Sequence, residues 1–229
     1  MTKHIGIVAC SYEGAALCYR TICNEGAQYL GRHAHPEVSL HTHPLSEYMN
    51  YIENDDWNGV AQLMLSSANK LSSIGADILI CPDNTAHQAF PKVQKESTTP
   101  WLHIAAEVAK EAARHNYKKV GILGTKFLME GPVYPEKFEA HGISYEIPTA
   151  EQRSHINSII FDELVYGIIN EESKKYFLTV IDELKSRGCD SVVLGCTEIP
   201  LIVVPQESPL PTLDSTRILA RAALRYALE

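Results

Sequence analysis

Short apolar runs alternate with longer amphipathic stretches along the whole chain. Apolar runs of strand length lie at residues 4–10, 36–43, 76–81, 118–124, 143–148 and 189–196. Stretches with the apolar spacing of a helix lie at residues 13–30, 58–75, 99–116, 134–142, 152–170, 171–188 and 208–228. Strands that alternate with helices of about 10–15 residues are typical of βαβ units and a parallel sheet. The pattern therefore predicts an α/β fold.

One sequence pattern occurs twice: a glycine at the end of a helix, an aspartate two residues later, an apolar strand, and then a cluster of polar residues. It is written SSIGADILICPDNT at residues 72–85 and KSRGCDSVVLGCTE at residues 185–198. The repetition indicates two similar lobes: residues 1–96, completed by a C-terminal helix at 210–229, and residues 97–209. Open parallel sheets bind ligands beyond the carboxyl ends of their strands. We therefore expect both polar clusters to face a cleft between the lobes.

Composition narrows the class of partner. The 229 residues are 45% hydrophobic and 21% charged, with a net charge of -8. This balance is typical of a folded protein, and it favours neither nucleic acid nor an anionic membrane as partner. No apolar run approaches the roughly 18 residues that span a bilayer, and the first residues lack the apolar region of a signal peptide. We expect a cytoplasmic protein whose six cysteines are reduced, and none of them forms a CxxC pair.

The two polar clusters also carry a family resemblance. The segment VVLGCTEIPLI at residues 192–202 is similar to the second active-site signature of the aspartate/glutamate racemase family, and DNTAH at 83–87 to most of the first. Residues 102–112, 118–143 and 210–216 also fit this family. The resemblance implies two flavodoxin-like or Rossmann-like lobes related by a pseudo-twofold axis, an active site in the cleft between them, and a homodimer. It also implies a racemase or epimerase that needs no cofactor or metal and acts on a small amino-acid-like substrate.

In such enzymes two residues on opposite faces of the substrate exchange protons with its Cα. Both are usually cysteines, and Cys196 matches the second one residue by residue. A thiol has a reference pKa of about 8.5, which a helix N-terminus can lower toward neutral pH. The resemblance further implies a set of substrate-binding residues: Ser11, His43, Asn84, Thr85, Thr125, Thr197 and Glu198.

The first catalytic position admits three interpretations. Aligned on Asn84, the family's cysteine is replaced by Asp83, which makes Asp83 the base that opposes Cys196. Alternatively, Asp83 is only the N-cap of a helix over residues 84–90. In the third interpretation the base is Cys81, which lies two residues earlier, beyond Pro82.

Departures from the family pattern concern the substrate side chain. The family often has an Asn-Pro pair followed by an arginine, but here His43 replaces the asparagine and no arginine follows. A lysine expected before Gly167 is replaced by Val165, and a threonine by Leu128. These changes remove the cations expected to bind a distal carboxylate. They predict a neutral or less acidic substrate, unless His41 and His43 supply the charge.

Other histidines keep two interpretations open. His33, His35, His41 and His43 could form a metal site, although contact with substrate or solvent is favoured. His87 and His103 could contact substrate or bond to the backbone.

Three functions remain open on these residues. The first is a two-base racemase or epimerase that uses Asp83 and Cys196. The second is a lyase or isomerase on the same scaffold, such as a decarboxylase with a single cysteine. The third is a ligand-binding homologue that has lost its catalytic pair.

Overall fold

The computed structural model describes residues 2–229, and within them the chain forms two compact units. Unit 1 comprises the residues up to Glu107 together with Thr216–Glu229, and unit 2 comprises Val108–Ser215. Each unit contains a four-stranded sheet in which every strand pair is parallel. The predicted α/β class is confirmed.

The sheet of unit 1 has the order β2-β1-β3-β4. Its strands are β1 (Ile5–Ala9), β2 (Val38–Thr42), β3 (Ile78–Ile80) and β4 (Trp101–Leu102). Strand β1 is buried at all five positions, whereas the edge strand β2 has no buried residue. A buried central strand of this kind reads as a continuous apolar run, as residues 5–9 do.

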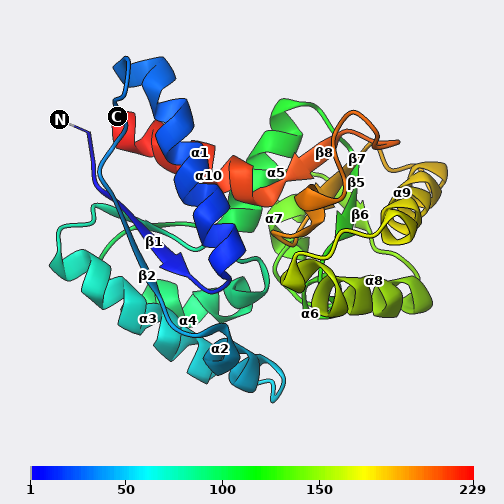
Figure 1. The fold of residues 1–229 in the computed structure, drawn as a ribbon, viewed down its shortest axis with the longest axis horizontal. Helices are drawn as coiled ribbons and strands as arrows, with labels where there is room; N and C mark the ends of the chain where they lie inside the picture. The colour runs from blue at the N-terminus through cyan, green and yellow to red at the C-terminus, as the bar shows by residue number, and fades with distance from the viewer. Residues whose placement is uncertain (1) are drawn as a thin grey trace. The chain divides into compact units, whose positions relative to one another are not determined.

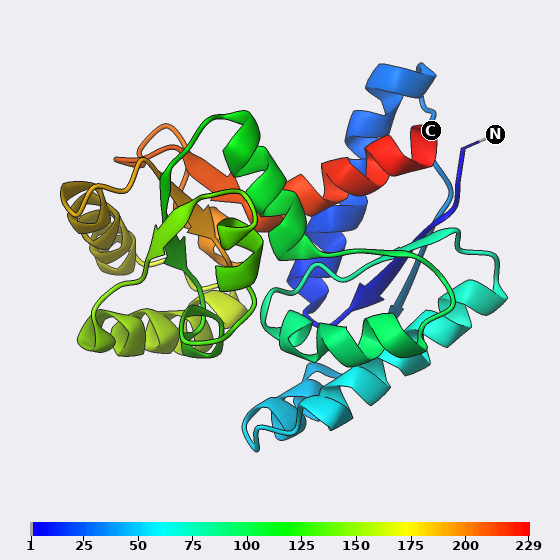
Figure 2. The ribbon, with the colours of Figure 1, turned by 180° about the vertical axis from the view of Figure 1, so that it is seen from behind.

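Helices cover both faces of this sheet (Figures 1 and 2). The helices are α1 (Tyr12–Leu30), α2 (Leu45–Ile52), α3 (Trp57–Ser73), α4 (Phe90–Glu96), the start of α5 (Ile104–Arg114) and most of α10 (Ser215–Leu228), with a 3₁₀ turn η1 (Thr85–Ala89). Helices α1 and α10 form one apolar core with β1 and β3. Helix α3 packs against β1 from the other face, where Gly6 leaves room for Leu71.

Unit 2 has the order β6-β5-β7-β8. Its strands are β5 (Lys119–Leu123), β6 (Ser144–Glu146), β7 (Ser191–Leu194) and β8 (Thr212–Asp214). Besides the rest of α5, its helical segments are α6 (Lys126–Met129), α7 (Pro135–Glu139), α8 (Ala150–Asp162), η2 (Leu164–Tyr166), α9 (Glu171–Ser186) and η3 (Ile199–Leu201). Residues of α8, α9 and β7 form its main apolar core.

The two sheets have the same strand order, shifted by four strands. The predicted repetition also holds for the turn and the side-chain hydrogen bond that precede β3 and β7. Gly75 and Gly188 both have positive φ at the end of a helix, a conformation that glycine adopts without strain. Two residues later, the carboxylate of Asp77 accepts from the amide of His4, and that of Asp190 from the amide of Lys118. The same chain reversal therefore leads into β3 and β7.

The sequence pattern predicts one edge strand of each sheet, β2 and β6, and misses the other, β4 and β8. Residues 99–116 were expected to be one helix, but β4 occupies Trp101–Leu102 and α5 begins only at Ile104. Residues 208–228 were also expected to be a helix, but β8 occupies Thr212–Asp214. Strands of two or three residues are too short to show a period of two, and their pairing partners lie far away in sequence. Helix α2 was missed as well.

Candidate active site

The predicted site residues of unit 1 lie beyond the carboxyl ends of neighbouring strands. Ser11 follows β1, Asp83 follows β3, and these strands are adjacent in the sheet although they are not consecutive in sequence. The strand order 2-1-3-4 places the topological switch point between β1 and β3, which is where open α/β sheets bind ligands. Ser11 is also the N-cap of α1 and accepts from the amide of Gly14 at 3.4 Å.

Asp83 is the half-buried residue in a segment that is otherwise almost wholly buried. Its Oδ1 accepts a hydrogen bond from the amide of Ala86 at 2.9 Å. This is the bond that a capping side chain makes at the start of a helical turn. Asp83 therefore caps the turn, and the same carboxylate stands at the end of β3. Asn84 and Thr85, which follow it, are 3% and 9% exposed.

Cys81 lies in a different environment. It is 0% exposed, and burial raises the pKa of its thiol well above the usual value, with the Asp83 carboxylate adding to the rise. A buried neutral thiol is a poor proton acceptor near neutral pH. These properties favour Asp83 over Cys81 as a base.

Strand register supports the same choice. Ile7 of β1 pairs with Ile80, and Ile122 of β5 pairs with Val193. When the two units are aligned on these first strands, Asp83 and Cys196 each lie three residues beyond the matched residue of the third strand. Cys81 corresponds to Leu194, a core residue of β7.

His87 bonds to the backbone. Its Nδ1 lies 2.7 Å from the carbonyl oxygen of Asp83, and the amide of Ile104 donates to Nε2 at 3.3 Å. Because an amide can only donate, the ring is neutral with its proton on Nδ1. Burial lowers the pKa of His87 to about 4. His103 caps the start of α5, where its Nδ1 accepts from the amide of Ala106 at 3.4 Å.

A basic cluster lies at the end of β2, between this strand and α3. Nδ1 of His41 bonds to Ser67, its Nε2 lies 2.8 Å from Nζ of Lys70, and Nε2 of His43 lies 3.2 Å from Oγ of Ser66. Burial, then Lys70 and then His43 lower the pKa of His41, so a permanent cation here is Lys70 rather than His41. Lys70 lies on α3, 29 residues from His41, so no local pattern in the sequence links the two. Within residues 2–229, no group of three or more His, Cys, Asp or Glu side chains is arranged to hold a metal ion.

In unit 2 two glycines allow the strand ends to approach closely. The amide of Gly195 donates to the carbonyl of Leu123 at 2.7 Å, and a Cβ on Gly195 would lie 2.7 Å from that oxygen. The same Cβ would meet Leu128, which is buried and packs over Gly124 and Gly195. Glycine is therefore required just before Cys196. Leu128 belongs to the core beneath the strand ends.

Thr125 follows β5 as Ser11 follows β1. It is the N-cap of α6, and its side chain accepts from the amide of Leu128 at 3.2 Å. Val165 is partly buried in η2 and packs against the unit 2 core, as Cys196 does.

Cys196 begins a short polar run at the end of β7. Its Sγ donates to Oε2 of Glu198 at 2.8 Å, and Oγ1 of Thr197 donates to the same oxygen at 2.7 Å. Thr197 and Glu198 are each 5% exposed. A nearly buried carboxylate thus contacts the thiol that the sequence signature identifies.

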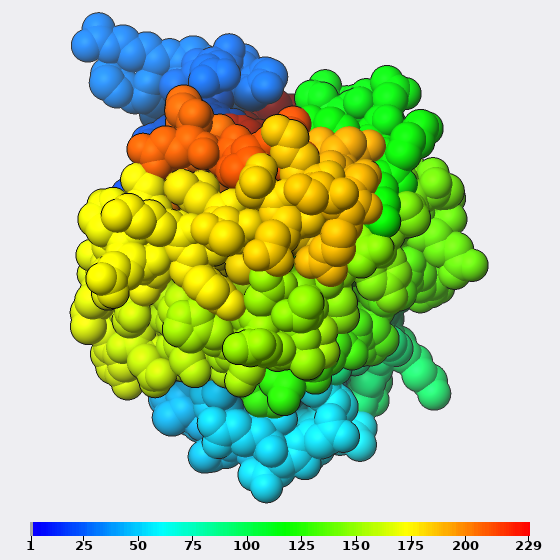
Figure 3. Space-filling model, turned by 90° about the vertical axis from the view of Figure 1, so that its right-hand side faces the viewer, coloured from blue at the N-terminus to red at the C-terminus, as the bar shows by residue number. Residues whose placement is uncertain are grey.

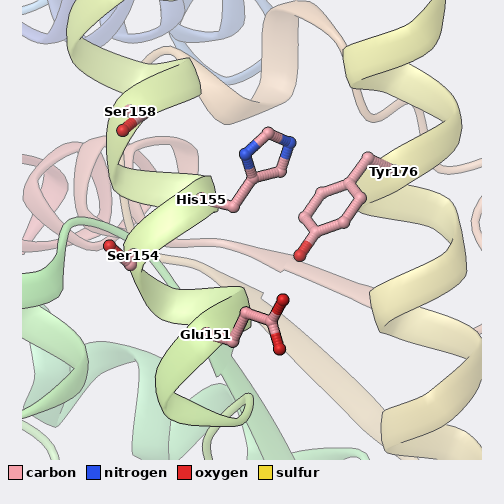
Figure 4. A pocket seen from close by; sticks show the side chains of 5 residues that line it. All are labelled: Glu151, Ser154, His155, Ser158 and Tyr176. Carbon is pink, nitrogen blue, oxygen red and sulfur yellow. The ribbon is translucent and has the colours of Figure 1, made fainter.

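A separate hollow of about 620 Å³ lies on the surface of unit 2, lined by Glu151, Ser154, His155, Ser158 and Tyr176. It lies between α8 and α9, on the face shown in Figure 3. The rings of His155 and Tyr176 meet edge to face at 4.3 Å, and the Tyr176 hydroxyl points toward Glu151 (Figure 4). None of the predicted site residues lines this hollow.

Comparison with known proteins shows which family the chain matches. The model of the Asp/Glu/hydantoin racemase family matches residues 7–223. The crystal structure of a putative Asp/Glu racemase from Yersinia pestis is 33% identical, with a TM-score of 0.91 over 99% of this chain and 100% of that one. An aspartate racemase homologue from Pyrococcus horikoshii OT3 is 28% identical, with a TM-score of 0.86 over all of both chains.

Two further relatives match at lower identity. The broad specificity amino-acid racemase RacX of Bacillus subtilis (strain 168) is 24% identical over 195 residues, which are 83% of this chain and 81% of that protein. The glutamate racemase of Aquifex pyrophilus is 27% identical over 152 residues, which are 62% of this chain and 54% of that protein. The chain therefore spans about half of that glutamate racemase.

The fold is that of an α/β protein built from two units, each with a four-stranded parallel sheet. The chain belongs to the Asp/Glu/hydantoin racemase family. Membership of this family supports an amino-acid racemase, as the sequence signatures predicted. No helix among residues 2–229 combines the length and the apolar character needed to cross a membrane.

Proposed function

We propose that the protein is a cofactor-independent amino-acid racemase or epimerase in which Asp83 and Cys196 exchange protons with the substrate Cα from opposite faces. The observation that carries this proposal is their equivalent position in the two repeats, three residues beyond matched residues of β3 and β7. A two-base reaction needs one proton acceptor and one donor, and each repeat offers one group of the right chemistry at that point.

The remaining strand-end residues would bind the substrate. Ser11 caps α1, a helix of 19 residues whose first amides can stabilise an anion. The substrate carboxylate and the carbanion that forms at Cα are both negative, so they gain from such donors. Asn84, Thr85 and Thr125 would complete the contacts, with His43 near the side chain.

We further propose a substrate with a neutral side chain. A distal carboxylate that leaves water needs a cation, because an unpaired buried charge is costly. Val165 is apolar, the pKa of His41 is lowered, and Lys70 is exposed with its Nζ 2.8 Å from Nε2 of His41, so none of the three supplies a buried charge for a distal carboxylate. The Bacillus subtilis relative is called a broad specificity amino-acid racemase, a name that is compatible with more than one kind of substrate side chain.

One observation favours the alternative function, a decarboxylase with a single cysteine, so the experiment must distinguish the two. The carboxylate of Asp83 already caps a helical turn, which would leave Cys196 as the only acid–base group. Purified enzyme would be incubated with a panel of L- and D-amino acids and with malonate-like acids, followed by chiral chromatography and CO₂ detection. We expect interconversion of enantiomers without CO₂. Release of CO₂ would favour the decarboxylase, and neither reaction would favour a binding protein.

The family resemblance also leads us to propose a homodimer. Light scattering at micromolar concentration tests this directly. A mass near 51 kDa, twice the chain mass of 25.5 kDa, is expected, and a mass near that of one chain would contradict it.

A further inference from the structure

Glu198 accepts two short hydrogen bonds on one oxygen, from Cys196 and from Thr197. Both donors precede it directly in sequence, and the turn into η3 brings their side chains back onto its carboxylate. Glu198 is 5% exposed, so little of its surface meets water. The family resemblance assigned Glu198 to substrate binding, but its carboxylate is engaged with the thiol.

The chemistry of this contact fixes where its proton lies. A carboxylate can only accept, so the hydrogen between the two groups belongs to sulfur. The reference pKa values of a thiol and a glutamate differ by about 4 units, which favours thiol plus carboxylate by a factor of about 10⁴ over thiolate plus carboxylic acid. A thiolate in this position would put two negative charges within about 3 Å, and like charges oppose ionisation.

We propose that Glu198 is a positioning residue that keeps Cys196 as a thiol in the resting enzyme, which makes Cys196 the proton donor and Asp83 the resting base. This inference rests on the proposed function. Thr197 anchors the carboxylate through its own bond, so that the charge stays beside sulfur.

The protons balance over one turnover. The Asp83 carboxylate takes the Cα proton, and the electron pair of the broken C–H bond remains on Cα. The S–H bond of Cys196 then breaks, and its proton bonds to Cα on the opposite face. The step leaves Asp83 as a carboxylic acid and Cys196 as a thiolate beside the Glu198 carboxylate, whose repulsion makes the thiolate a stronger base. The resting state returns when Asp83 releases its proton to solvent and the thiolate takes one up, or when the opposite enantiomer reacts in the reverse direction.

The test is the pH dependence of Cys196 alkylation by iodoacetamide, followed at the Cys196 peptide by mass spectrometry. In Glu198→Gln we expect the alkylation midpoint to fall by about one pH unit or more, because the neighbouring charge is gone. Near neutral pH, this shift would speed alkylation about tenfold. Glu207→Gln is the matched control, because it removes one exposed carboxylate of the same unit that pairs with Lys174. That control should leave the midpoint unchanged.

A second variant separates charge from structure. Glu198→Asp keeps the negative charge, so its midpoint should stay closer to that of the unmodified protein than to that of Glu198→Gln. Thermal melting confirms that both variants are folded. An unchanged or raised midpoint in folded Glu198→Gln, or equal midpoints in the two variants, would overturn the proposal.

Alkylation needs no substrate, so the two proposals can fail separately. A midpoint shift in an enzyme that racemises nothing would contradict the proposed function and leave the thiol–carboxylate pair standing. If the enzyme racemises amino acids but Glu198→Gln leaves the alkylation midpoint of Cys196 unchanged, only the proposed role of Glu198 is overturned.

Discussion

The carboxylate of Asp83 accepts a hydrogen bond from the amide of Ala86, three residues later, at 2.9 Å. The bond gives Asp83 a structural role as a cap. The proposed catalytic role uses the same side chain, and the two roles differ in what they demand of it. A cap needs an oxygen acceptor, whereas a base needs a group that can take a proton.

Asp83→Asn should separate these roles. Asparagine caps a helical turn about as well as aspartate, so the free energy of unfolding should change by less than about 0.5 kcal/mol. The amide cannot act as a base, so racemisation should fall by at least about 100-fold. Urea denaturation and a chiral assay on the same preparation measure both effects.

Asp83→Ala is the companion variant. It loses cap and base together, so about 1 kcal/mol of stability should disappear along with the activity. If Asp83→Asn racemises at the normal rate, Asp83 is a cap alone.

Replacement of the two cysteines should have opposite consequences. Cys81 is fully buried and burial raises the pKa of its thiol, so Cys81→Ala should cost about 1 kcal/mol of stability and keep activity. Cys196→Ser should remain folded and lose activity, because a hydroxyl is a far weaker acid than a thiol. Activity assays and melting curves of both variants test this, and loss of activity in folded Cys81→Ala would restore Cys81 as a candidate base.

His87 should make stability depend on pH. Its pKa is about 4 in the folded protein and about 6.5 when unfolded, so the unfolded chain binds the proton more readily between these values. Its contribution is complete above pH 6.5 and is lost as pH falls toward 4, by about 3 kcal/mol in all. Urea denaturation from pH 7 to pH 4 should show a shallower loss in His87→Gln than in the unmodified protein. Equal slopes would contradict a neutral buried His87.

The substrate preference should respond to a cation at residue 165. We expect poor turnover of aspartate and glutamate, and a rise of about tenfold in their kcat/KM relative to a neutral amino acid in Val165→Lys. Tyr166→Lys is the matched control, because residue 166 is 74% exposed and carries the same added charge. Efficient turnover of an acidic amino acid by the unmodified protein would redirect attention to Lys70 and His43.

Much of the fold could be predicted from the sequence because its signals are local. The buried runs at residues 76–81 and 189–196 mark β3 and β7, and the glycines at 75 and 188 mark the helix ends before them. Strands β4 and β8 could not be predicted in this way. Their few residues lie within longer helical patterns, and only pairing with β3 and β7 makes them strands.

The candidate site shows the same division between local and distant signals. Cys196 stands in a recognisable run of residues, so the sequence alone makes it a candidate catalytic residue. The hydrogen bond from its thiol to Glu198 depends on the backbone conformation of residues 196–198. The residue types alone do not determine that conformation. Lys70 was missed because its neighbour His41 is distant in sequence, and the role of His87 was left open because its partners are backbone atoms.

The two-base claim is tested most directly by racemisation of one enantiomer of the best substrate in D₂O, stopped after a few per cent of conversion. Two residues on opposite faces would give product that carries solvent deuterium at Cα from the start, while the remaining substrate keeps its protium. Asp83→Asn and Cys196→Ser would each abolish this product. Product that retains the original Cα proton, or unchanged deuterated product from either variant, would contradict the account.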